Sequence, residues 1–202
     1  MENKKKLKLS EMLLKSNSAI LLLILIVVVI VFSVLNGNYF STQNATNLFY
    51  SATTVGLLAI GETFLIIGGH IDLSNSALAA MSGVMVALLI KSGMPWPLAM
   101  LLVLLVGAVV GLINSTLANV FSIQPFIATL AVASICEGVG YIISDGRPIG
   151  VPNRYFINLG TYKLFGWIPV PVIILIVRFL VFGFLLTTTT FGRQEYIIVR
   201  NT

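Results

Sequence analysis

The segment GGHIDLSNS, residues 68–76, concentrates side chains that could do chemistry in an otherwise apolar part of the chain. It contains His70, the only histidine, together with Asp72, Ser74 and Asn75. These side chains offer hydrogen-bond donors and acceptors beside two glycines, which indicates a polar break between two helices. Either Asp72 or Ser74 is expected to N-cap the second helix by accepting a free amide of its first turn.

Two interpretations of this segment stay open. Asp72 either caps the following helix, which we favour, or lines a route for a solute. His70 is either a hydrogen-bonded residue at a helix end, which we also favour, or a ligand for that solute. Gly68 and Gly69 would allow the tight break in both cases, and Asn75 would line or brace it.

Catalysis is not expected from this chain. It has no G-x-x-x-x-G-K-S/T segment for nucleotide phosphates, and one histidine with scattered serines gives no credible nucleophile arrangement. The single cysteine, Cys136, allows neither an intrachain disulfide nor a cysteine-based metal site, and is expected to pack in a helix. The sequence therefore predicts a non-enzymatic protein without a metal or cofactor of its own.

The composition indicates an integral membrane protein. The chain has 202 residues, of which 57% are hydrophobic and 9% are charged, whereas a soluble domain has about 25% charged residues. Six apolar segments approach the roughly 20 residues that span a bilayer. They cover about 19–35, 48–67, 75–90, 97–121, 126–144 and 168–190. The sequence predicts an all-α, polytopic transmembrane helical bundle formed by a single domain, residues 1–202.

The charge pattern predicts the topology. Five of the twelve Lys and Arg residues precede the first apolar segment, which suits a cytoplasmic basic tail at residues 1–18 and not a nucleic-acid site. Six crossings return the C-terminal segment to the cytoplasm. The segment 145–167 is then an extracytoplasmic loop, long enough at 23 residues to form a docking surface with Arg147 and Arg154.

Three charged residues, Glu62, Glu137 and Arg178, fall inside apolar segments. Each costs about 2.5–3.5 kcal/mol at a helix centre, so none should face lipid. They either mark a polar route through the bundle or form structural contacts. The structural alternatives are a buried Glu–Arg pair and a protonated Glu bonded to a helix backbone.

Four segments resemble the membrane permease subunits of bacterial ABC importers for monosaccharides, the ribose, xylose and galactose group related to branched-chain amino acid permeases. The segment AIGETFLIIGGHIDLSNSALAAMSGV, residues 59–84, is similar to that family's G-G/H-I-D-L-S signature. GLINSTLAN at 111–119, the segment 123–149 and the segment 168–201 agree with further family blocks in order and spacing. Departures include Ser115, where the family has Gly, and Glu137, where arginine is usual.

The resemblance implies one subunit of a larger assembly in the bacterial cytoplasmic membrane. Its partners would be an ATP-binding-cassette ATPase subunit, which binds the ATP, an extracytoplasmic sugar-binding protein and a second permease subunit, identical or different. Arg147 and Arg154 would contact the binding protein. The residues implied for the pathway or its helix break are Gly68, Gly69, His70, Asp72, Ser74, Asn75, Asn114, Ser115, Gln124, Pro125 and Thr129.

Two alternative functions stay open. The family continues beyond the segment containing Gly192, Arg193 and Tyr196 into a region that couples to the ATPase, so this chain could be a truncated, transport-inactive permease fragment. It could also be a secondary transporter in which Glu62 or Glu137 binds a proton or ion. Neither the sugar nor the membrane depth of the 68–76 break follows from the sequence.

Overall fold

The computed structural model describes residues 17–190, 192 and 194. Six of the described helices are long and apolar enough to cross a membrane. They are α2 (Asn17–Leu35), α3 (Thr42–Ile67), α4 (Ser74–Lys91), α5 (Trp96–Asn119), α6 (Pro125–Ser144) and α8 (Val170–Thr188). The prediction of an all-α polytopic membrane protein is confirmed. The basic tail lies outside the described residues, and the cytoplasmic position of the N-terminus stays a prediction.

The chain falls into two compact units, Met1–Leu48 and Phe49–Thr202, and the single-domain assignment stays a prediction. In the first unit, α2 is apolar on every side and has no buried residue, as suits a helix surrounded by lipid. The next helix, α3, begins six residues before the predicted apolar span. The hydroxyl of Ser41 accepts the amide of Asn44 at 3.2 Å, which caps a polar first turn that hydropathy cannot detect.

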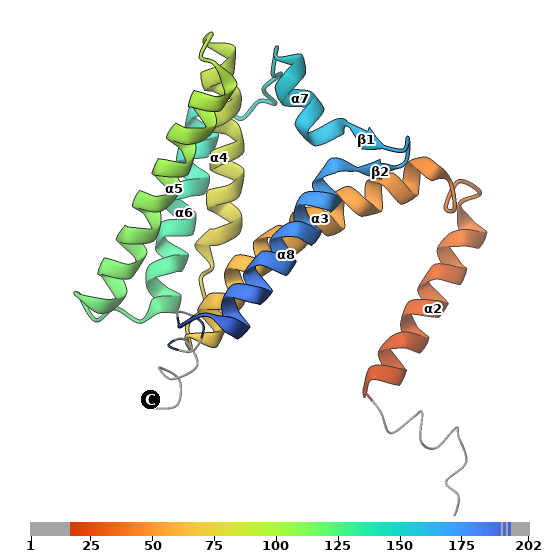
Figure 1. The fold of residues 1–202 in the computed structure, drawn as a ribbon, viewed down its shortest axis with the longest axis horizontal. Helices are drawn as coiled ribbons and strands as arrows, with labels where there is room; N and C mark the ends of the chain where they lie inside the picture. The colour runs from red at the N-terminus through yellow and green to blue at the C-terminus, as the bar shows by residue number, and fades with distance from the viewer. Residues whose placement is uncertain (1–16, 191, 193, 195–202) are drawn as a thin grey trace, which may run out of the picture. The chain divides into compact units, whose positions relative to one another are not determined.

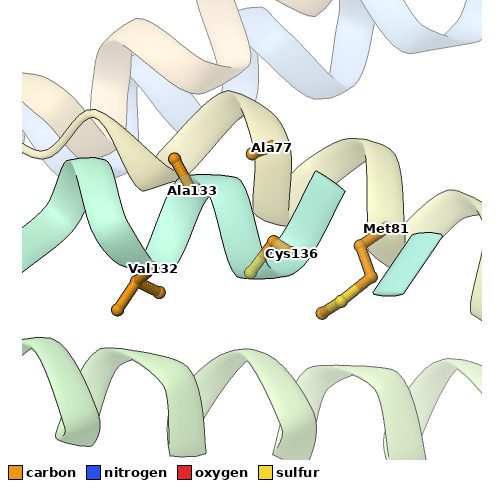
Figure 2. Packing of buried hydrophobic residues seen from close by; sticks show 5 residues of the cluster. All are labelled: Ala77, Met81, Val132, Ala133 and Cys136. Atoms are coloured by element: carbon orange, nitrogen blue, oxygen red, sulfur yellow. The ribbon is translucent and has the colours of Figure 1, made fainter. Parts of the chain in front are cut away.

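Within the second unit, α4, α5 and α6 pack against one another (Figure 1). The α4–α6 seam is made of small or narrow side chains: Ala77 and Met81 of α4 face Ala133 and Cys136 of α6 (Figure 2). At Gly140 the helices are so close that an added Cβ would lie 3.6 Å from the Cα of Met81. Lipid gives helices no hydrophobic reason to associate, so close backbone packing over small residues stabilises such a seam.

Helices α3 and α8 form a second contact. Phe64 of α3 and Phe182 of α8 meet edge to face with their ring centroids 5.5 Å apart. Gly56 of α3 lies against the side chain of Leu175 of α8. This contact holds the helix that leads into the 68–76 segment.

The predicted loop 145–167 is a structured connector and not an irregular loop. The connector reaches residue 169, two residues into the predicted span 168–190, and contains α7 (Arg154–Thr161) and a two-stranded antiparallel hairpin, β1 (Lys163–Leu164) and β2 (Ile168–Pro169). Asn153 caps α7 by accepting the amide of Phe156 at 3.0 Å. The sequence missed these elements because both are shorter than the windows over which periodicity is detectable.

Candidate functional site

The polar break between α3 and α4 is formed by a glycine turn. Helix α3 ends at Ile67, and Gly69 adopts a φ of +80°, a conformation that favours glycine. The amide of His70 donates to the carbonyl of Leu65 at 2.8 Å, and the amide of Gly69 donates to the carbonyl of Ile66 at 3.0 Å. These two bonds form a Schellman motif, which stops the helix and satisfies its last carbonyls.

The start of α4 is stabilised by Asp72. Its Oδ1 accepts the amide of Ser74 at 2.7 Å and the hydroxyl of Ser74 at 2.6 Å. The N-cap position belongs to Leu73, so the assignment of that position to Asp72 or Ser74 was wrong by one residue. The carboxylate reaches past the cap to the first helical amide, as in an Asx turn. The expected hydrogen bond to a free amide of the first turn is therefore present.

Hydrogen bonds from three other helices hold this break in place. Asn114 of α5 donates through Nδ2 to Ser74 Oγ at 2.8 Å and to Asp72 Oδ2 at 3.3 Å. Thr129 Oγ1 of α6 accepts the amide of Leu73 at 3.2 Å. Glu62 Oε1 of α3 accepts the amide of Asp72 at 3.0 Å. We call Glu62, Asp72, Ser74, Asn114 and Thr129 the break network.

Within this network, one polar atom has no partner among the described residues. Asn114 is 9% exposed, and its amide nitrogen is used twice, but its buried Oδ1 accepts no hydrogen bond from the described part of the chain. A buried acceptor without a partner costs about 1–3 kcal/mol. This orphan oxygen lies where α5 meets the break, next to a cavity.

The cavity has a volume of about 290 Å³ and lies between the break, α5 and α6. Its polar lining comes from carboxylate, imidazole, amide and hydroxyl side chains, and it contains no Lys, Arg or Glu. The lining residues are Leu65, His70, Ile71, Asp72, Gly111, Asn114, Ser115, Ala118, Asn119, Pro125 and Thr129. Its size is at the lower end of the range for small-molecule sites, about 300–1,000 Å³.

The structure brings together six of the predicted pathway residues at this cavity: His70, Asp72, Asn114, Ser115, Pro125 and Thr129. Ser74 is fully buried behind them in the break network. Asn75 lies elsewhere, donating to the carbonyl of Leu58 at 3.2 Å and lining a separate pocket with Glu62. Gly68 is in the turn, and Gln124 holds the N-cap position of α6 without a side-chain bond.

The charged residues singled out in the sequence do not lie together in the structure. Glu62 accepts the backbone amide of Asp72, which lies in the break before α4 and not in a helix, so the alternative of a protonated Glu bonded to a helix backbone stays a prediction. Glu137 on α6 and Arg178 on α8 are exposed and do not line the cavity. Arg147 and Arg154 are exposed on the connector between α6 and α8. Gly192 is buried, whereas Arg193 and Tyr196 lie outside the described residues.

The sequence reasoning missed Gly111, Ala118 and Asn119 of α5. Together with Asn114 and Ser115 they follow helical spacing of three and four residues, which places them on the cavity side of one helix. Asn119 Nδ2 donates to Ser115 Oγ at 3.1 Å. This stripe of small and polar residues in an apolar helix was the signal in the sequence from which these cavity-lining residues could have been predicted.

Comparisons with known proteins show what this chain is similar to. Residues 44–201 match the family described as branched-chain amino acid transport system / permease component. The ribose import permease protein RbsC of Bacillus subtilis (strain 168) is 39% identical over 172 residues, which cover 85% of this chain and 53% of the relative.

Two further relatives are similar in extent. The D-allose transport system permease protein AlsC of Escherichia coli (strain K12) is 36% identical, with 85% of this chain and 53% of the relative covered. The L-arabinose ABC transporter permease protein AraH of Azospirillum brasilense is 32% identical, with 81% of this chain and 48% of the relative covered. The chain thus spans about half the length of the curated relatives it matches. No solved structure matches it.

Proposed function

Because the chain belongs to the branched-chain amino acid transport system / permease component family, we propose that it is the transmembrane subunit of an ATP-binding-cassette importer for a monosaccharide. It is a multi-pass protein of the bacterial inner membrane. The names of its ribose, allose and arabinose relatives support the substrate class. The partners are an ATPase subunit, an extracytoplasmic sugar-binding protein and a second permease subunit.

The observation that carries this proposal is the chemistry of the cavity beside the break. A monosaccharide is neutral and presents several hydroxyl groups, each of which both donates and accepts hydrogen bonds. The side chains of Asn114, Ser115, Asn119 and Thr129 carry both kinds of group without a charge, and the imidazole of His70 and the carboxylate of Asp72 line the same cavity. Transporters place substrate sites where helices are interrupted and the freed backbone lines a protein cavity.

The decisive experiment is co-expression with the ATPase subunit and sugar-binding protein of a ribose system, followed by reconstitution. We expect co-purification with the ATPase and uptake of labelled ribose, allose or arabinose that requires ATP. An ATPase variant with its P-loop lysine replaced is the control. Insertion without ATPase binding or uptake would instead support the inactive-fragment alternative.

Replacing Glu62 by glutamine separates importer from ion-coupled transporter. The glutamine carbonyl can still accept the Asp72 amide, now bonded at 3.0 Å, but it cannot bind a proton. We expect Glu62→Gln to keep uptake within about twofold, and Glu62→Ala to lose about 1–3 kcal/mol of stability by orphaning that amide.

Uptake by the reconstituted complex and thermal unfolding in detergent measure these two effects. Glu137→Gln, at an exposed position on α6, tests the other carboxylate of that alternative and should also change neither uptake nor stability. Loss of uptake in Glu62→Gln with normal thermal stability would favour ion coupling through Glu62.

Charge reversal at Arg147 and Arg154 tests the contact with the sugar-binding protein. Both side chains are exposed on the connector between α6 and α8. Charged residues at the rim of a protein interface govern how fast the two proteins associate. Reversing both charges is therefore expected to lower ATP-dependent uptake roughly tenfold, while membrane insertion stays normal. Because α4 and α6 are parallel, the exposed Lys91 at the end of α4 lies on the same side of the membrane and gives a matched control, Lys91→Glu. Unchanged uptake in the double variant would remove the contact role.

A further inference from the structure

The hairpin between α7 and α8 has a fixed base. The amide of Val170, the first residue of α8, donates to the carbonyl of Tyr162 at 2.9 Å. Pro169 of β2 is fully buried. The Tyr50 hydroxyl of α3 donates to the carbonyl of Thr161 at 3.4 Å. The hairpin is therefore attached to the start of α8, and the end of α7 that leads into it is bonded to Tyr50 of α3.

The tip of this hairpin consists of Phe165, Gly166 and Trp167. Phe165 and Gly166 have φ values of +53° and +81°, and the Trp167 amide donates to the Leu164 carbonyl at 3.3 Å. A turn with two positive φ values favours Asn-Gly, and a bulky side chain there is strained. Phe165 is also 81% exposed. Neither the turn nor internal packing accounts for an aromatic residue at this position.

The position of the tip relative to the membrane follows from the length of α8. Its 19 residues span about 28 Å, which matches a hydrocarbon core of about 30 Å and places Val170 near the boundary of that core. The tip precedes Val170 by three to five residues. Three residues of extended backbone span about 10 Å, so Trp167 lies within about 10 Å of the boundary of the hydrocarbon core. In Figure 1 the strands leave the start of α8 sideways and do not continue along its axis.

Amphipathic aromatic side chains gather at this end of the bundle. Both tryptophans lie there, Trp96 at the start of α5 and Trp167 before α8. Exposed tyrosines join them: Tyr141 near the end of α6, Tyr155 in α7 and Tyr162 before β1. Tryptophan and tyrosine are enriched where a membrane protein meets the lipid headgroups, because one part of each ring system is apolar and the other is polar.

The charge of the connector also suits a lipid surface. Residues 145–169 contain three basic residues, Arg147, Arg154 and Lys163, but one acidic residue, Asp145. A net positive segment at the membrane surface is attracted to anionic headgroups. Helix α8 has no buried residue and follows the hairpin directly in sequence, so a bilayer is the occupant that these observations favour.

We propose that the hairpin tip, Phe165 to Trp167, inserts into the lipid headgroup layer and attaches the α6–α8 connector to the membrane surface. The headgroup layer supplies an amphipathic environment for the exposed rings and offsets the strain of the turn. This proposal depends on membrane insertion of the chain and not on what the chain transports.

Tryptophan fluorescence tests the proposal in the full chain. The chain has two tryptophans, so Trp96→Phe leaves Trp167 as the only one. In phosphatidylcholine vesicles containing phosphatidylglycerol, lipids brominated near the headgroup end of the acyl chain should quench its emission at least twofold. Aqueous iodide should quench it several-fold less than free tryptophan. Efficient quenching by iodide together with none by brominated lipid would overturn the proposal.

A second variant separates insertion from folding. Phe165→Asn places a residue that the turn favours at the tip, so thermal stability in detergent should stay equal or rise. Without the Phe165 ring the tip should insert less, and iodide quenching of Trp167 should rise about twofold. Unchanged quenching by both reagents would show that Phe165 does not insert. If Trp167 is protected from iodide only when the sugar-binding protein is added, the tip binds a protein partner and the lipid proposal is overturned.

Discussion

Replacement of Asp72 by alanine is expected to abolish transport and to lower stability by about 3 kcal/mol or more. The carboxylate accepts two bonds from Ser74 and one from Asn114. Both partners are buried, and each buried donor left without an acceptor costs about 1–3 kcal/mol. The break would also lose one of its two hydrogen bonds to Asn114 of α5, so the cavity should change its shape. Thermal unfolding in detergent and uptake by the reconstituted complex measure the two effects.

Two control variants identify the origin of this loss. Ser76→Ala removes an exposed hydroxyl from the same turn of α4 and should change neither stability nor uptake. Asp72→Asn keeps the size and one acceptor oxygen, and its new amide is placed to donate to Asn114 Oδ1, which has no partner among the described residues. We therefore expect a smaller loss from Asp72→Asn than from alanine. Equal stability of the alanine variant and the native chain would contradict the structural role of the break network.

Replacement of Gly140 by leucine is expected to separate α4 from α6. A Cβ at Gly140 would lie 3.6 Å from the Cα and 3.8 Å from the Cβ of Met81, which is ordinary contact, so alanine should be tolerated. The further atoms of leucine have no room beside this backbone, and overpacking of a well-packed interface costs about 1–3 kcal/mol. The midpoint of thermal unfolding in detergent reports the change.

Gly138→Leu is the matched control because it makes the same substitution two residues away. Gly138 is exposed, and an added Cβ there would meet no atom within 4 Å. Both variants gain the same helix propensity, about 1 kcal/mol, so their difference isolates packing at the seam. Equal midpoints for the two leucine variants would mean that α4 and α6 do not approach as closely as Gly140 and Met81 indicate.

The helices that cross the membrane were predictable because their signal is local. Each needs about 20 apolar residues in succession, and hydropathy detects such a run wherever the rest of the chain lies. The end of α3 is also local, since Gly69 and its hydrogen bonds to the preceding turn involve neighbouring residues. The early start of α3 at Thr42 and the hairpin before α8 escaped prediction because polar caps and two-residue strands have no hydropathy signal.

By itself the sequence determined the number of spans, the polar character of segment 68–76 and the family resemblance. Only the tertiary structure decided which polar residues meet. Asn114 and Asp72 are 42 residues apart, and Thr129 and Leu73 are 56 apart, yet both pairs are hydrogen bonded. Glu62 and Glu137 look alike in sequence, but one bonds to the break and the other is exposed on α6. Hydropathy adds up along the chain, whereas a hydrogen bond requires that remote helices bring two atoms to within about 3 Å in a suitable direction.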